Sequence, residues 1–132
     1  MNTFVTIAGN LTRDPELRFT QGGKAVCNLS VAVTPRRRDE RTGQWEDGQT
    51  SFYNAGVWGP AAENTAESLA KGDRVLVTGR LVEREWEQEG QSRRRHEIVA
   101  DEIGVSLQFA TAKPAKARRV EQHTERGDEP PF

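Results

Sequence analysis

The chain has 132 residues, with 19 basic and 20 acidic side chains, a formal net charge of −1 and 34% hydrophobic residues. This length fits one domain with at most a short appendage. Because the net charge is close to zero, any affinity for polyanions has to come from local clusters of basic residues. No apolar run approaches the ~20 residues that span a bilayer, and no secretory signal opens the sequence. We therefore expect no membrane partner.

A single cysteine, Cys27, excludes an intrachain disulfide and a cysteine-cluster metal site. A reducing cytoplasm is the expected compartment. Cys27 falls on the apolar face of a predicted strand, so we interpret it as a core residue, with a role between subunits as the alternative.

Short strands dominate the sequence up to residue 112. Alternation of apolar and polar residues, which is typical of half-buried strands, is clearest in the second and third of them. In the third, Tyr53, Ala55 and Val57 face one way, and Phe52, Asn54 and Trp58 face the other. The predicted strands are Thr3–Ala8, Ala25–Thr34, Ser51–Trp58, Arg74–Trp86 and a less regular Arg95–Phe109.

One helix is predicted after the third strand. Pro60 suits a first helical position, and Gly72 stands where a C-terminal cap belongs. Three strands, a helix and two strands form the layout of an OB-fold, a five-stranded Greek-key barrel. We predict this all-β fold with one short helix for residues 1–112. The polar segment 113–132, which has a short acidic tip, is predicted to be a disordered tail because it has little apolar surface to bury.

Signals for catalysis are weak. The two histidines, His96 and His123, are isolated, and no phosphate-cradling glycine loop is present. The most enzyme-like feature is a row of alternating carboxylates, which suits either a divalent metal or, more commonly, a solvated hairpin edge. The row consists of Glu83, Glu85, Glu87 and Glu89. We predict no enzyme, no catalytic residues, no metal and no cofactor, with a metal-dependent nuclease as the weaker alternative.

Signals for binding are stronger because arginines and aromatic residues occur together. Arginines cluster in two predicted hairpin loops, at 36–38 with Arg41 and at 93–95. Large aromatics on the polar face of a strand indicate either a covered packing surface or a platform on which unpaired bases stack. Arginines beside such a platform neutralise phosphates. The predicted stacking residues are Phe52, Trp58 and Trp86, assisted by Trp45, and the predicted phosphate contacts are Arg36, Arg37, Arg38, Arg80 and Arg84.

An ordered series of motifs resembles bacterial single-stranded DNA-binding proteins. It opens with GNLTRDPELRF at 9–19 and continues with NLSVAV at 28–33, LAKGD at 69–73 and TGRL at 78–81. The resemblance implies an OB-fold, usually a homotetramer, that binds single-stranded DNA without sequence preference in DNA replication, repair and recombination. It also implies that Phe52, Trp58 and Trp86 hold the family's stacking positions, in a cytoplasmic, nucleoid-associated protein.

Two departures from the family pattern stand out. A tryptophan common in the family aligns near Arg37, while Trp45 comes several residues later. The tail is short, and its tip, which consists of Asp128, Glu129, Pro130, Pro131 and Phe132, is less acidic than the family's. These features suggest a short-tailed paralogue. We expect the tip to dock weakly on replication and repair proteins by terminal carboxylate capture, or to be vestigial. The alternative function is a primosome-type OB-fold adaptor that acts mainly through protein contacts.

Overall fold

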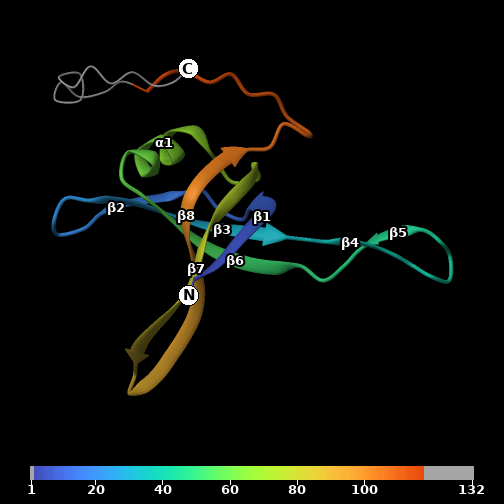
Figure 1. The fold of residues 1–132 in the computed structure, drawn as a ribbon, viewed down its shortest axis with the longest axis horizontal. Helices are drawn as coiled ribbons and strands as arrows, with labels where there is room; N and C mark the ends of the chain where they lie inside the picture. The colour runs from blue at the N-terminus through green and yellow to red at the C-terminus, as the bar shows by residue number, and fades with distance from the viewer. Residues whose placement is uncertain (1, 118–132) are drawn as a thin grey trace.

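The computed structural model describes residues 2–117, so the tip at 128–132 lies outside the described residues. The described chain forms a β-barrel with α1 at one end, and the β7–β8 hairpin projects from the other end (Figure 1). Its elements in chain order are β1 (Thr3–Leu11), β2 (Glu16–Phe19), β3 (Ala25–Val33), β4 (Arg36–Arg38), β5 (Trp45–Asp47), β6 (Ser51–Trp58), α1 (Pro60–Ser68), β7 (Arg74–Gln88) and β8 (Gln91–Val105).

The sheet closes on itself. Its strand order is β1-β7-β8-β6-β3-β2, and a further pairing of β1 with β3 joins the two sides. β6 and β8 pair in parallel, while the other neighbouring strands are antiparallel. The five long strands, with α1 between the third and the fourth, confirm the predicted OB-fold.

The last predicted strand was misplaced by four residues at each end. β8 spans Gln91–Val105, because its ladder partner β7 pairs as far as Gln88↔Gln91 at the hairpin and Val75↔Val105 at the barrel. Beyond Val105 the ladder continues only by the hydrogen bond from the Ser106 N–H to the Arg74 carbonyl (2.8 Å). No strand or helix occurs in 106–117, and the domain boundary at residue 112 stays a prediction.

Three short strands were missed. β2 has four residues, too few for alternation to be recognised, and it is held by its pairing with β3. β4 and β5 have three residues each and form a separate two-stranded sheet. Their side chains are exposed on both faces, so no apolar pattern marks them.

The helix ends earlier than predicted. The Leu69 N–H donates to the Thr65 carbonyl (3.0 Å) and ends α1, and Gly72 follows in a turn with φ 95°. This turn is fixed by other partners: the Gly72 N–H donates to the Leu11 carbonyl (2.9 Å), and the Asp73 carboxylate accepts from the Ala70 N–H (2.9 Å). Tertiary contacts with β1 therefore compete with the last helical turn. No helix within 2–117 is long and apolar enough to cross a membrane.

The apolar side chains of the alternating strands point into the barrel and form its core. Cys27, Leu29 and Val31 of β3 are fully buried, as are Val75 and Val77 of β7. Burial raises the pKa of the Cys27 thiol because the thiolate would lose its hydration. The core assignment of Cys27 is confirmed, and the alternate residues of the same strands are left facing outward.

Two glycines permit close approach of backbones where the sheet curves. A Cβ on Gly9 of β1 would lie 2.3 Å from the Ala32 carbonyl oxygen, and one on Gly79 of β7 would lie 2.1 Å from the Val99 carbonyl oxygen. The second site adjoins the register shift between Thr78 and Gly79. Glycine is thus required sterically at two positions: Gly9, where β1 approaches β3, and Gly79, where β7 bends beside β8.

Gly9→Ala tests the closure. The new methyl group would push β1 away from β3, so we expect the free energy of unfolding to fall by about 1–3 kcal/mol, measured by urea denaturation. Gly104→Ala is the matched control, because a Cβ at Gly104 meets nothing within 4 Å. Equal stability of the two variants would contradict a steric role for Gly9.

Candidate nucleic-acid interface

The outward face of β6 carries two of the predicted stacking residues. Phe52 is 67% exposed and Trp58 is 38% exposed, whereas Ala55 and Val57 on the inward face are buried. The antiparallel register sets Phe52 opposite Ala32 and Trp58 opposite Val26. The face predicted for this strand is confirmed, and both aromatic rings are left available to solvent.

The β7–β8 hairpin holds the third predicted stacker in contact with an arginine. Trp86 is 40% exposed and pairs with Arg93 across the hairpin. The guanidinium carbon of Arg95 lies 5.5 Å from the centre of the Trp86 ring, within the range of a cation–π interaction. Arg95, which the sequence placed in a cluster but not among the phosphate contacts, therefore belongs to this face.

Glu97 links the hairpin to the β6 face. Its side chain is only 12% exposed, and its carboxylate lies 3.3 Å from Arg84 Nη2 and 3.9 Å from Arg95 Nη2. Arg84 and Arg95 stand directly opposite each other across the hairpin, so the carboxylate offsets two like charges. Glu97 also pairs with Asn54 of β6 in the parallel ladder. The aromatic residues of β6 and of the hairpin thus share one continuous face.

Arg80 lies on the same outward side of β7, closer to the barrel. It stands opposite Val99 of β8 and Phe4 of β1, and its side chain is exposed. The structure thus places Arg80, Arg84 and Trp86 on one side of β7, as the alternation predicted.

The first arginine cluster lies on a strand, β4, where a loop was expected. Arg36 pairs with Asp47 (3.5 Å) and Arg37 with Glu46 (3.2 Å), while Arg38 stands opposite Trp45. The antiparallel register between β4 and β5 brings each basic side chain to a partner on the other strand. Trp45 is 63% exposed on this hairpin, which extends from the side of the barrel and forms a sheet of its own (Figure 1).

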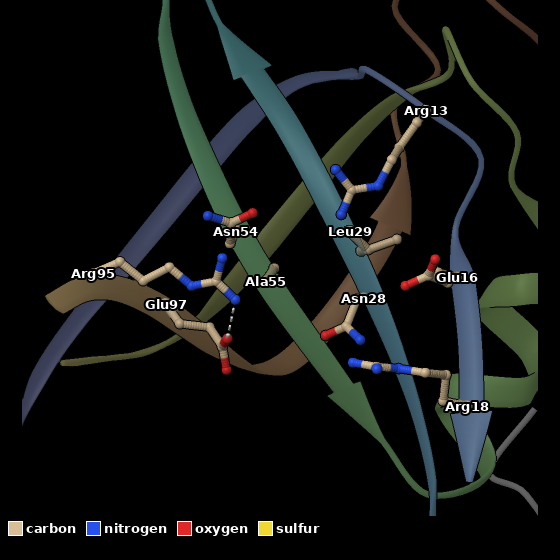
Figure 2. Close-up of a pocket in the computed structure, with 9 residues that line it drawn as sticks. All are labelled: Arg13, Glu16, Arg18, Asn28, Leu29, Asn54, Ala55, Arg95 and Glu97. Atoms are coloured by element: carbon tan, nitrogen blue, oxygen red, sulfur yellow. Dashed lines mark ion pairs between the residues drawn. The ribbon is translucent and has the colours of Figure 1, made fainter. Parts of the chain in front are cut away.

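A polar depression of about 130 Å³ lies on the outward face of β2, β3, β6 and β8 (Figure 2). Arg13, Arg18 and Arg95 project into it from three segments, with Asn28 and Asn54 between them. Arg13 and Arg18 were missed as site residues because β2 was not predicted. β2 is too short for its alternation to be recognised and Arg13 lies in the loop before it, so no strand pattern pointed to either residue.

The glutamate row is engaged by basic residues of β8. Glu85 pairs with Arg94 (3.2 Å), and a Glu83 oxygen lies 3.9 Å from Nε2 of His96. Glu89 lies in the hairpin turn with φ 53°, beyond the end of β7 at Gln88, and so does not continue the row on the strand. Within the part of the chain that the structure describes, no three His, Cys, Asp or Glu side chains gather as metal ligands would.

Comparison with known proteins identifies the family of the chain. A family model described as "Single-strand binding protein family" matches residues 1–106. The chain belongs to the single-strand binding protein family.

Curated members of the family resemble most of the chain. A "Single-stranded DNA-binding protein" from Mycolicibacterium smegmatis is 54% identical over 119 residues, which is 89% of this chain and 72% of the relative. One from Paenarthrobacter nicotinovorans is 48% identical over 132 residues, or 98% of this chain and 78% of the relative. The similarity to the family that the motifs suggested is confirmed.

Solved structures of family members share the fold. The small single-stranded DNA-binding protein from Streptomyces coelicolor superposes with a TM-score of 0.69 at 34% identity, covering 81% of this chain and 96% of that one. A deletion variant of the Thermus aquaticus single-stranded DNA binding protein gives 0.68 at 30% identity, covering 83% of this chain and 52% of that one.

Glu97→Gln tests the charge arrangement at the centre of the face. Removing the carboxylate leaves Arg84 opposite Arg95 without an anion, so we expect the free energy of unfolding to fall by about 1–2 kcal/mol at low salt. Added salt should reduce the loss because it screens the repulsion. Glu85→Gln, which breaks an exposed pair, is the matched control and should cost less. A loss for Glu97→Gln that is equal at low and high salt would contradict this account.

Proposed function

We propose that the chain binds single-stranded DNA without sequence preference and protects exposed strands during DNA replication, repair and recombination. The observation that carries the proposal is the continuous outward face that joins Phe52 and Trp58 to Trp86 through Arg95 and Glu97. Membership of the single-strand binding protein family and the names of its relatives support it. The chain acts by binding and not by catalysis.

Bases stack on Phe52, Trp58 and Trp86. Each ring is between 38% and 67% exposed and is carried by a strand of the barrel sheet, so the backbone that presents it is in place before a base arrives. Stacking contributes about 1–3 kcal/mol per base, and every base has a face to offer, so the contact does not depend on sequence. Trp45 assists from the β4–β5 hairpin, where it stands opposite Arg38.

Phosphates are contacted by the arginines beside these rings. Arg38 and Arg80 are exposed, and Arg36, Arg37 and Arg84 are ion-paired with nearby acids. The exposed pairs of Arg36 and Arg37 contribute only about 0–1 kcal/mol, so a phosphate can take the place of the acid there at little cost, whereas Arg84 keeps its mostly buried partner Glu97 and offers its remaining N–H donors. The paired arginines act as phosphate contacts that are already oriented.

Assembly into a homotetramer uses the unpaired edge of β1 and the apolar residues beside it. The outer edge of β1 is unpaired from Thr3 to Gly9, because only Asn10 and Leu11 pair with β3. Exposed apolar residues lie near this edge: Phe4 is 65% exposed, and Leu76 is 45% exposed at a depression of about 280 Å³. An unpaired strand edge beside apolar side chains is a template for a second copy of the chain.

The tail tip 128–132 contacts replication and repair proteins in this proposal, in a cytoplasmic, nucleoid-associated setting. If the adaptor alternative holds instead, deletion of Phe132 will impair function more than loss of Trp86, and affinity for DNA will be weak.

Trp86→Ala and Trp58→Ala test stacking. Each should weaken binding of poly(dT) by about 1–3 kcal/mol and reduce the quenching of tryptophan fluorescence, because a base loses its partner. Thermal unfolding should change little, since both rings lie outside the core. Unchanged affinity in both variants, or equal quenching by matched duplex DNA, would favour the adaptor.

Leu76→Glu tests assembly. A carboxylate placed in an apolar contact would be desolvated, so we expect the variant to sediment as a smaller species than the wild type in analytical ultracentrifugation. Ser68→Glu on the exposed side of α1 is the control and should keep the wild-type mass. A tetramer that survives Leu76→Glu would assign the interface to another face.

A further inference from the structure

The polar depression beside β6 contains guanidinium groups that the fold leaves without acidic partners. Arg13 and Arg18 form no ion pair with any residue in the range 2–117, in contrast to Arg36, Arg37 and Arg84. Both side chains are exposed and reach over β3, Arg13 near Leu29 and Arg18 near Asn28 (Figure 2). Their charges are therefore available to an anion from outside.

Backbone contacts fix the segment that carries Arg13. The Thr12 N–H donates to the Ser30 carbonyl (2.9 Å), which holds the loop after β1 against β3. The neighbouring Asp14 carboxylate accepts from the Lys71 N–H (2.8 Å), so that acid is engaged away from Arg13. Arg18 is fixed by the β2–β3 ladder, where it stands opposite Val26. The two guanidinium groups thus converge because two independently anchored segments present them.

The remaining lining supplies further donors. Asn28 and Asn54 lie at the floor of the depression, and Arg95 enters from the β8 side (Figure 2). Two carboxylates, Glu16 and Glu97, also line it; Glu97 is shared between Arg84, outside the depression, and Arg95, at a longer distance (3.9 Å), whereas Glu16 is in no ion pair with Arg13 or Arg18. Three guanidinium groups and two amides around one spot suit an oxyanion with several acceptor oxygens, such as a phosphodiester.

The depression lies where a bound strand has to cross. Phe52 and Trp58 are six residues apart on β6, which is ~20 Å at the rise of a strand, and Asn54 lies between them. A DNA strand with bases stacked on both rings carries its backbone over this part of the face. The depression and the stacking residues therefore fit one ligand.

We infer that Arg13, Arg18 and Arg95 form a phosphate-binding notch that grips the backbone of single-stranded DNA between the aromatic residues of β6. The inference rests on the proposed function, and it assigns the notch to phosphate only, with no part in base stacking.

Arg13→Gln/Arg18→Gln tests the notch in titrations of the full chain with poly(dT) at a series of salt concentrations. Each phosphate contact contributes ~0.7 to the log–log dependence of affinity on salt for single strands. We expect the slope to become shallower by about 0.7 for each lost contact, with the fluorescence quenching at saturation unchanged because the tryptophans are intact. Arg13→Lys/Arg18→Lys keeps both charges and should restore most of the slope.

Lys71→Gln is the control, because it removes one positive charge in the α1–β7 turn, outside the depression, and should keep the wild-type slope. A double variant with the wild-type slope, while the wild type binds poly(dT) normally, would overturn the notch and leave the proposed function intact. Reduced quenching at saturation with an unchanged slope would assign the arginines to the stacking surface and also overturn it. Absence of binding by the wild type would instead contradict the proposed function.

Discussion

Closure of the sheet is the constraint on which this structure depends. Only Asn10 and Leu11 of β1 pair with β3, yet this short contact closes β1, β7, β8, β6 and β3 into a continuous barrel. The approach requires Gly9, because a side chain there would collide with the Ala32 carbonyl. Once the barrel is closed, one set of alternating residues fills its interior. The other set has no structural task inside and is free to carry aromatic and basic groups.

The long strands could be predicted from the sequence because each has a buried apolar face and a solvent-exposed polar face. Alternation in β6 placed Phe52 and Trp58 outward without any knowledge of their neighbours, and the same pattern placed Trp86 with Arg80 and Arg84. The sequence did not predict the elements and element boundaries that depend on pairing with another strand. β2 and β4 exist through pairing, and the ends of β8 are set by β7.

Only part of the site was predicted, because the sequence shows which face of a strand a residue lies on but not which residue it contacts on another strand. Residue type and face identified the stacking residues, but ion pairing depends on distances across the fold. Arg36 and Arg37 read as a free basic cluster, and the structure pairs them with Asp47 and Glu46. Conversely, Arg13 and Arg18 stand among acidic neighbours in the sequence and are unpaired within 2–117. A net charge of −1 is therefore compatible with a basic binding surface, because many charges cancel locally.

The contact of Arg95 with Trp86 also bears on the entropy of association. Between the Glu97 carboxylate and the indole ring, the long Arg95 side chain has already lost rotational freedom when the chain folds. Ordering a flexible side chain at an interface costs about 0.5–1.5 kcal/mol, and preorganisation removes that cost from the binding step. The contacts with Glu97 and Trp86 thus orient the charged group of Arg95 before any nucleotide arrives.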